Sequence, residues 1–321
     1  MLEHGGRLRE ASAHWDIPLA DWLDLSTGIS PWPYPLPALP PEVWQRLPEE
    51  EDGVKAAARD YYGAQRIAVL PGSQAAIQRL PAMFPPGRVA MPTPLYGEHP
   101  AAWKAAGHEL VGWEEPADYA VLCNPSNPTG RVFSRRALVE RALLGLRLLV
   151  VDEAFIDADP AESLAALAGS GVAANVVVLR SLGKFFGLAG ARLGCAIGAP
   201  ALLDRLTESM GPWAVSHPAR WAGRLALADQ EWQDGQRRRL EAASQRLALL
   251  LRDGGLGEPT GTALFQYVVT PRAAELHKAL ARRGILVRRF DAPEALRFGL
   301  PGEEGEWRRL ADGLDEALDQ H

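Results

Sequence analysis

A hydroxyl, an amine and a guanidinium fall within one short glycine-rich segment of the chain. The segment, SLGKFFGLAGARLG, spans residues 181–194 and follows an apolar run. The Lys184 amine can form a Schiff base with an aldehyde. Ser181 and Arg192 can bind a phosphate, because the arginine fork matches phosphate oxygens. A surface loop with an incidental lysine is the alternative reading of this segment.

A second candidate for phosphate binding lies in PGSQAAI. It places Gly72, Ser73 and Gln74 at an expected strand-to-helix turn, where backbone N–H groups favour an anion. The alternative is a plain helix cap, with Ser73 as the N-cap residue. The phosphate-binding interpretation of this turn therefore depends on the segment that contains Lys184.

Short apolar runs alternate with helical patterns over the first two thirds of the chain, which predicts a mostly parallel sheet with crossover helices. The expected strands are residues 66–70, 88–92, 119–123, 146–152, 176–180 and 193–197. The expected helices are residues 73–83, 95–106, 134–145 and 161–169, with Ser73 and Ser134 as N-caps. Most of these strands are continuous apolar runs, as expected for strands buried on both faces.

The remaining third predicts a small α+β domain. A long polar helical pattern covers residues 216–252, and strands and helices alternate from residue 263 to the end. We expect an N-terminal arm over residues 1–44 that joins the small domain, a large domain over 45–215, and a connecting helix with the small domain over 216–321.

Composition excludes several classes of protein. The chain has 321 residues, 47% of them hydrophobic, and a net charge of −6, so no basic footprint for nucleic acid is expected. Its two cysteines, Cys123 and Cys195, sit in apolar runs, which favours buried unpaired thiols and a reducing compartment. No run is apolar enough for a membrane span or a signal peptide, so we expect a cytoplasmic protein without membrane partners.

Residues 181–194 resemble the S-x-x-K-x-x-x-[GL]-x-G-x-R-x-G block of class I/II aminotransferases, the pyridoxal-phosphate (PLP) enzymes of fold type I. NPSNPTG at residues 124–130 is similar to the family's N-P-x-N-P-T-G motif, and VVDEAFID at 151–158 to its aspartate strand. The resemblance covers nearly the whole chain. It implies a fold type I PLP-dependent transferase, with a large mostly parallel α/β domain and a small α+β domain.

The resemblance also implies a role for each matching residue. Lys184 would hold PLP as a Schiff base, and Asp152 would keep the pyridine nitrogen protonated so that the ring can accept electrons. Asn127 would donate to the phenolic oxygen, and Tyr96 of PLYGEHPAAW would stack on the ring. The phosphate would be bound by the remaining residues: Gly72, Ser73, Gln74, Ser181 and Arg192.

An arginine near the C-terminus is expected to receive the α-carboxylate of the substrate. ALRFGLP at residues 295–301 resembles the family's R-x-x-x-G/P strand and assigns this role to Arg297. Arg288 and Arg289 of ILVRRF are alternatives, and each of the three is also compatible with a solvated rim charge.

The N-terminus narrows the resemblance to one group within the family. HGGRLREAS and DWLDLSTGISP are similar to the H-G-G-x-[IL]-R-E-A and D-[FL]-S-[TA]-x-[IL]-N-P segments of cobalamin-pathway threonine-phosphate decarboxylases. Histidinol-phosphate aminotransferases share the lysine block but generally lack the H-G-G opening. The resemblance therefore assigns His4, Gly5 and Gly6, with Ser30 and Arg288, to the binding of a phosphorylated amino acid.

Three positions depart from the pattern of relatives. Ser30 stands where an asparagine is usual, and Leu47 replaces a tyrosine that reaches the cofactor phosphate of the partner subunit in many relatives. Phe155 replaces a tyrosine that aminotransferases often bond to the cofactor's phenolic oxygen, which favours decarboxylation as a family correlation. The expected protein is a homodimeric threonine-phosphate decarboxylase. A histidinol-phosphate-type aminotransferase and a non-catalytic PLP-fold protein are the alternatives.

Overall fold

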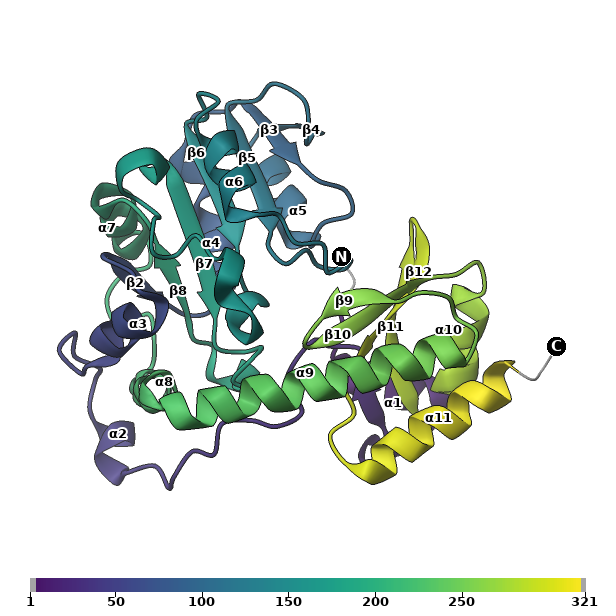
Figure 1. Cartoon of the computed structure of the whole chain (residues 1–321). Helices are drawn as coiled ribbons and strands as arrows, with labels where there is room; N and C mark the ends of the chain where they lie inside the picture. Colours follow the sequence, from purple (N-terminus) through teal and green to yellow (C-terminus); the bar gives the residue numbers. More distant parts are fainter. Residues whose placement is uncertain (1–3, 319–321) are drawn as a thin grey trace. The chain divides into compact units, whose positions relative to one another are not determined.

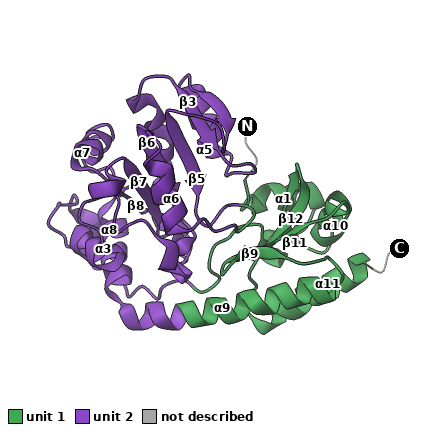
Figure 2. Cartoon of the chain, turned by 45° about the horizontal axis from the view of Figure 1, so that its top comes forward, with its two compact units in different colours: residues 1–32, 128–130, 237–321 green, residues 33–127, 131–236 purple. Residues whose placement is uncertain are grey.

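The computed structural model describes residues 4–318, and the chain divides into two compact units (Figure 2). Unit 1 comprises the chain up to Trp32, Pro128–Gly130, and Arg237 onward. Unit 2 comprises Pro33–Asn127 and Arg131–Gln236. Residues 33–44 and 216–236 thus belong to unit 2, which differs from the boundaries expected at 44 and 215.

Close helix packing explains the second of these differences. Helix α8 (His217–Ala228) packs on α3 (Val54–Tyr62), both in unit 2. A Cβ at Gly223 of α8 would lie 2.1 Å from Leu193 Cδ2 and 3.4 Å from Val54 Cγ2. Because α8 is seated this closely against unit 2, the boundary falls inside the following helix, α9 (Gln230–Asp253).

Unit 2 is built on a seven-stranded sheet in the order β2-β8-β7-β6-β5-β3-β4 (Figure 1). Its strands are β2 (Ile67–Leu70), β3 (Arg88–Met91), β4 (Glu109–Gly112), β5 (Tyr119–Cys123), β6 (Leu148–Asp152), β7 (Val176–Ser181) and β8 (Gly194–Ile197). Strands β3 to β7 pair in parallel, and β8 runs antiparallel to β2 and β7. All six strands predicted from apolar runs are confirmed.

Helices on both faces explain why these strands are apolar throughout. Every residue of β5 and β6 is buried, as expected for a parallel sheet covered on both sides. The other helices of unit 2 are α2 (Pro41–Gln45), α4 (Ser73–Arg79), α5 (Glu98–Ala105), α6 (Arg135–Ala142) and α7 (Pro200–Glu208). The N-cap of α6 is Ser134, whose side chain accepts from Ala137 N, as predicted.

Three local predictions were wrong. Gly72 precedes α4 with φ 76°, so Ser73 is the first helical residue and not its cap. The pattern expected as one helix over 216–252 is broken at Asp229 into α8 and α9. No α-helix covers 161–169, because the backbone N–H of Leu164 and the Ser163 hydroxyl donate to the buried Glu153 carboxylate instead.

Unit 1 carries a five-stranded sheet in the order β1-β11-β12-β10-β9. The strands are β1 (Leu23–Leu25), β9 (Thr260–Thr262), β10 (Phe265–Val269), β11 (Ile285–Asp291) and β12 (Glu294–Gly299), and the helices are α1 (Leu8–Trp15), α10 (Ala273–Ala281) and α11 (Glu304–Leu318). Strand β1 pairs in parallel with β11, so the N-terminal segment is part of this sheet.

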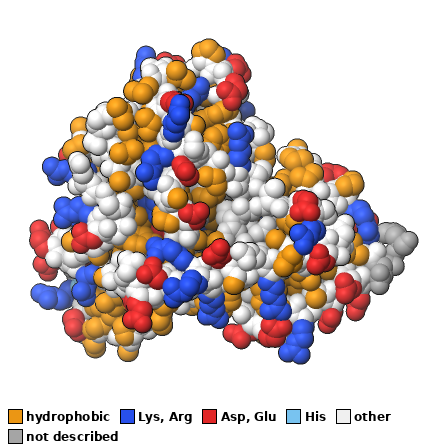
Figure 3. Space-filling view, viewed as in Figure 1, with side chains coloured by type: hydrophobic (Ala, Val, Ile, Leu, Met, Phe, Trp, Pro, Cys, Tyr) orange, Lys and Arg blue, Asp and Glu red, His pale blue; other side chains and the backbone are white. Residues whose placement is uncertain are grey.

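Charged side chains of both signs are distributed over the face of the molecule shown in Figure 3. On the face shown in Figure 3, lysine and arginine side chains are interspersed with aspartate and glutamate, without a large patch of one sign. Among the helices within residues 4–318, none is long and apolar enough to cross a bilayer.

Candidate active site

One cavity of about 130 Å³ in unit 2 is lined by every residue that was assigned to the cofactor. Its lining is Gly72, Ser73, Gln74, Tyr96, Cys123, Asn127, Asp152, Ala154, Phe155, Ser181, Lys184 and Arg192. Strands β5, β6 and β7 are parallel neighbours, so their carboxyl ends meet at one edge of the sheet. Segments spread over 120 positions of sequence converge there.

One end of the cavity is suited to an anion. The guanidinium of Arg192 lies against the turn before α4, since a Cβ at Gly72 would be 2.8 Å from its Nη2 atom. Gly72 has φ 76°, and any side chain there would also displace the arginine. Ser181 is the last residue of β7, where it pairs with Gly194 of β8. The arrangement gives a phosphate an arginine fork and serine hydroxyls.

A buried carboxylate lies elsewhere in the same cavity. Asp152, at the end of β6, is 4% exposed. Its Oδ1 accepts from Ala154 N at 3.1 Å, and its Oδ2 lies 3.0 Å from His99 Nε2. A carboxylate held in this way can hydrogen-bond a protonated ring nitrogen and keep its proton in place.

Tyr96 provides an aromatic face within reach of that carboxylate. Its hydroxyl donates to Gln74 Oε1 at 3.4 Å, and its ring meets the His99 ring edge-on at 6.2 Å. Burial, with the negative charges of Glu98 and Asp152, raises the pKa of Tyr96 well above its usual value. The tyrosine is therefore a neutral ring suited to stacking.

Lys184 sits on a loop anchored by aromatic side chains. Phe185 and Phe186, which follow it, are fully buried. Gly187 turns the loop with φ 67°, and a Cβ there would lie 2.6 Å from Pro33 Cα. The Lys184 ammonium lies 5.3 Å from the centre of the Phe155 ring. The amine is thus held at the cavity by the packing on both sides of it.

His99 is the functional residue that the sequence reasoning missed. It is fully buried on α5, three positions after Tyr96, and it contacts Asp152. In the helix expected over residues 95–106, Tyr96 and His99 would share a face, which was the available signal, although α5 itself begins at Glu98. The sequence around His99 did not by itself indicate that this histidine contacts Asp152.

We expect His99→Leu to weaken cofactor binding about 10- to 100-fold, because a hydrogen bond to a charged group contributes about 1.5 to 3 kcal/mol. The matched control is His108→Leu. His108 is also buried, but its Nε2 lies 3.0 Å from Pro81 O, whereas that of His99 lies 3.0 Å from the Asp152 carboxylate. Titration of each apoprotein with cofactor measures the effect. Equal affinities in the two variants would remove the role given to His99.

The residues assigned to the substrate lie in unit 1. Gly6 N donates to Ser26 Oγ at 2.7 Å, and a Cβ at Gly5 would lie 2.2 Å from Ser26 O, so only glycine fits there. His4, Gly5 and Arg288 line a cavity of about 260 Å³ together with Ser26. The same cavity has four further basic side chains: Arg7, His14, His277 and Arg289.

Arg297 and Ser30 are placed differently from that set. Arg297 on β12 is only 7% exposed, and its Nη2 donates to Ser26 O at 3.0 Å. It is therefore a buried, oriented arginine and not a solvated rim charge. Ser30 is also buried, and its hydroxyl bonds to the backbone of Trp32. Ser30 is absent from the lining of the His4 cavity.

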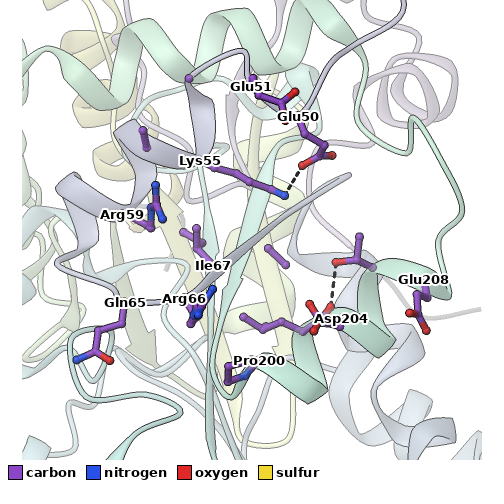
Figure 4. A pocket seen from close by; sticks show the side chains of 15 residues that line it. Glu50, Glu51, Lys55, Arg59, Gln65, Arg66, Ile67, Pro200, Asp204 and Glu208 are labelled. Carbon is purple, nitrogen blue, oxygen red and sulfur yellow. Dashed lines mark hydrogen bonds and ion pairs between the residues drawn. The ribbon is translucent and has the colours of Figure 1, made fainter.

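A larger hollow of unit 2, about 780 Å³, has a different character (Figure 4). It is bordered by α3, β2 and α7, and its charged side chains are of both signs. Lys55 and Glu50 form an ion pair across it. None of the residues assigned to the cofactor lines this hollow, so the smaller cavity at the strand ends is the candidate site.

Comparisons with known proteins show the family to which this chain belongs. The family described as "Aminotransferase class I and II" matches residues 51–314. A threonine-phosphate decarboxylase of Pseudomonas aeruginosa is 54% identical over 98% of this chain and 97% of its own. One from a Sinorhizobium species is 41% identical over the same shares.

A solved structure supports the fold independently of close sequence similarity. The histidinol-phosphate aminotransferase from Sinorhizobium meliloti, in complex with pyridoxal-5'-phosphate, matches with a TM-score of 0.83 at 20% identity. The match covers 99% of this chain and 98% of that one. The predicted fold type I architecture is confirmed.

The cavity fits pyridoxal 5'-phosphate, the cofactor of this chain. Arg192, Ser73 and Ser181 suit its phosphate, and the buried Asp152 suits its ring nitrogen. Lys184 supplies the amine that its aldehyde requires. These three chemical demands are met in one cavity whose residues come from the family's own motifs. The chain belongs to the aminotransferase class I and II family.

Proposed function

We propose that this chain decarboxylates L-threonine O-3-phosphate to (R)-1-amino-2-propanol O-2-phosphate and CO2, as a step of cobalamin biosynthesis. The observation that carries the proposal is the 54% identity, over nearly the full length of both chains, to a threonine-phosphate decarboxylase. The basic cavity beside the glycine segment of unit 1 supports a phosphorylated substrate.

Each group of the substrate has a residue to receive it under this proposal. The phosphate is bound by His4, Arg288 and Gly5, which line one cavity, and Gly6 holds this segment in place through its bond to Ser26 Oγ. The α-carboxylate is received by Arg297, whose buried guanidinium is already oriented by Ser26 O. The amino group would be directed to the cofactor aldehyde, which Lys184 would hold.

The chain's own residues then control which bond breaks. Bound PLP supplies a ring that accepts the electron pair left at Cα. Asp152 would hold the proton on the ring nitrogen, and the Lys184 amine would deliver a proton to Cα. Arg297 and the phosphate-binding residues would orient the substrate and so favour loss of its carboxylate over loss of its Cα hydrogen.

A histidinol-phosphate-type aminotransferase is the second candidate, favoured by the fold match to such an enzyme. It would use the same cofactor residues and differ in the fate of the amino group. A paired assay separates the two: CO2 release from L-threonine O-3-phosphate, and amino transfer from L-histidinol phosphate to a 2-oxo acid. CO2 without transfer supports the decarboxylase, and transfer without CO2 replaces it with the aminotransferase.

Binding of the substrate phosphate is tested by Arg288→Ala. We expect kcat/KM for L-threonine O-3-phosphate to fall about 10- to 100-fold, mainly through KM, because a charge-assisted hydrogen bond of about 1.5 to 3 kcal/mol is lost. Unphosphorylated L-threonine should react equally with both proteins. Arg289→Ala is the matched variant, since Arg289 lies 3.1 Å from Asp291. A larger effect at Arg289 would transfer the role to that residue.

We further propose that the protein acts as a cytoplasmic homodimer. Three large apolar side chains of unit 2 are unusually exposed: Trp44 (71%), Leu47 (61%) and Trp213 (60%). The bond between His217 Nδ1 and Arg46 O brings their segments together, and Figure 3 shows hydrophobic side chains over α2 at the lower left. Exposed apolar clusters of this kind mark protein interfaces.

The homodimer is tested by Trp44→Lys, which places a charge in the exposed apolar cluster. We expect the sedimenting species to shift from dimer to monomer, because burial of an unpaired charge opposes association. Leu144→Lys is the control, since Leu144 is equally exposed, at 70%, but follows α6. A dimer unaffected by Trp44→Lys would place the interface elsewhere.

A further inference from the structure

Three charged side chains lie buried together behind the cofactor cavity of unit 2. Arg180, near the end of β7, is 2% exposed, Glu153 is 0% exposed and Asp157 is 1% exposed. Arg180 Nη1 donates to Glu153 Oε2 at 2.9 Å, and Nη2 donates to Asp157 Oδ1. We name these three residues the Arg180 cluster. None of them lines the cavity.

Further contacts hold the cluster in one geometry. The guanidinium carbon of Arg180 lies 4.3 Å from the centre of the Tyr62 ring, a cation–π distance. Arg180 Nη1 also donates to Ser163 Oγ at 3.2 Å. Glu153 accepts from Ser163 Oγ at 2.6 Å and from Leu164 N at 2.7 Å. The cluster therefore fixes the segment after β6 as well as the two strand ends.

Stability alone does not explain such a cluster. Burial raises the pKa of Glu153, and the nearby Arg180 opposes that shift only in part. Burying several charges costs desolvation, and buried ion pairs of this kind can often be replaced by apolar side chains without loss of stability. The Arg180 cluster is better explained as a means of holding the ends of β6 and β7 in one specific arrangement.

The cluster is one peptide bond away from the cofactor residues on each strand. Glu153 directly follows Asp152, and Arg180 directly precedes Ser181. Because neighbouring residues of β7 point to opposite faces, Arg180 points away from the cavity that Ser181 lines, and Glu153 contacts it there. The backbones are joined at the same level, with Asp152 paired to Leu179 and Glu153 N donating to Leu179 O at 2.9 Å.

We propose that Arg180 is a positioning residue, which fixes through Glu153 and Asp157 the geometry between Asp152 and the loop from Ser181 to Lys184. When the ion pairs of the Arg180 cluster are in place, the Asp152 carboxylate and the Lys184 amine are held at one fixed separation. The proposal rests on the cavity as the PLP site and not on the reaction that follows.

Arg180→Lys tests the proposal, because lysine keeps the charge but has no fork to join two carboxylates. We expect the PLP dissociation constant to rise about tenfold, the scale seen when outer-shell partners of a bound group are lost. We also expect the pH at which the visible absorbance of the loaded protein changes to move by about half a unit or more, since that pH reports the environment of the cofactor–Lys184 bond.

Arg220→Lys is the matched control. Arg220 is also a buried arginine of unit 2, 5% exposed, and it donates to both oxygens of Asp52 and to Glu49 O at 3.0 Å. It lies on α8 and does not line the cavity. We expect it to lower the unfolding temperature of the apoprotein without changing PLP affinity or the absorbance midpoint.

Equal shifts in the two variants, or unchanged PLP affinity and midpoint in Arg180→Lys, would overturn the proposal. If Arg180→Lys does not fold, Asp157→Asn replaces it, because the amide keeps an oxygen for Nη2 while removing the charge. It should shift both cofactor readouts in the same direction by a smaller amount, and no shift would overturn the proposal. Both readouts are independent of CO2 release, so failure of the decarboxylase assay would leave this result standing.

Discussion

Replacing Lys184 by alanine is expected to lower the rate of CO2 release from L-threonine O-3-phosphate by at least about 1,000-fold. Two functions are lost at once. The amine that binds the cofactor covalently is gone, and so is the group that carries a proton to Cα, which alone contributes about 100- to 10,000-fold in enzymes. The fold should survive, because Phe185 and Phe186 anchor the loop and the lysine side chain only reaches into the cavity.

A second readout of Lys184→Ala does not depend on catalysis. Borohydride reduction of the PLP-loaded protein should attach the cofactor to the wild-type chain at Lys184, and mass spectrometry of the variant should find none there. Lys104→Ala is the control, since Lys104 lies exposed on α5 away from the cavity. Undiminished CO2 release by Lys184→Ala, or cofactor attached at another lysine, would contradict the assignment.

The cofactor half of the site could be predicted from sequence because its residues come from short motifs at strand ends. A buried parallel strand is a continuous apolar run, so the ends of β5, β6 and β7 were visible as the points where polar residues begin. Asn127, Asp152 and Lys184 follow directly from those points. Their meeting in one cavity is a consequence of parallel pairing.

Other features could not be predicted because they depend on contacts distant in sequence. The segment 161–169 has a helical composition, yet its backbone is held by Glu153, whose burial no local pattern reveals. His99 and Arg180 are single polar residues in apolar surroundings, and only the fold shows what each of them contacts. Ser30 was assigned to the substrate although it stands where relatives carry asparagine, and its hydroxyl bonds the nearby backbone at Trp32.

The substrate half was assigned by resemblance, and the structure adds a physical reason for part of it. His-Gly-Gly segments are usually unremarkable at a chain terminus. Here Gly5 approaches Ser26 O so closely that a side chain would not fit, and Gly6 N donates to the Ser26 hydroxyl. The segment is therefore held next to Arg288 by its glycines, in a cavity of basic side chains.

Replacing Asp152 by asparagine is the other change expected to have a very large effect. An amide cannot stabilise a positive charge on the ring nitrogen, so the ring would lose its proton and much of its capacity to accept electrons. We expect kcat to fall about 100- to 1,000-fold, the range found when one electrostatic partner of a developing charge is removed. The fold should be retained, because an asparagine Oδ1 can still accept from Ala154 N and its other atom can still bond His99.

Asp152→Glu separates charge from position in the same test. Glutamate keeps the negative charge but is longer, and the carboxylate site is closed on one side by His99 at 3.0 Å. We expect Asp152→Glu to retain more activity than Asp152→Asn, since charge is the larger requirement for holding the proton.

If Asp152→Asn released CO2 at the wild-type rate while binding PLP normally, the ring nitrogen would not need a carboxylate partner, and Asp152 would serve only to orient His99 and the end of β6. Equal losses in both variants would instead mean that the position of the carboxylate matters as much as its charge, as expected for a side chain fixed by two hydrogen bonds on a strand end that the Arg180 cluster holds from behind.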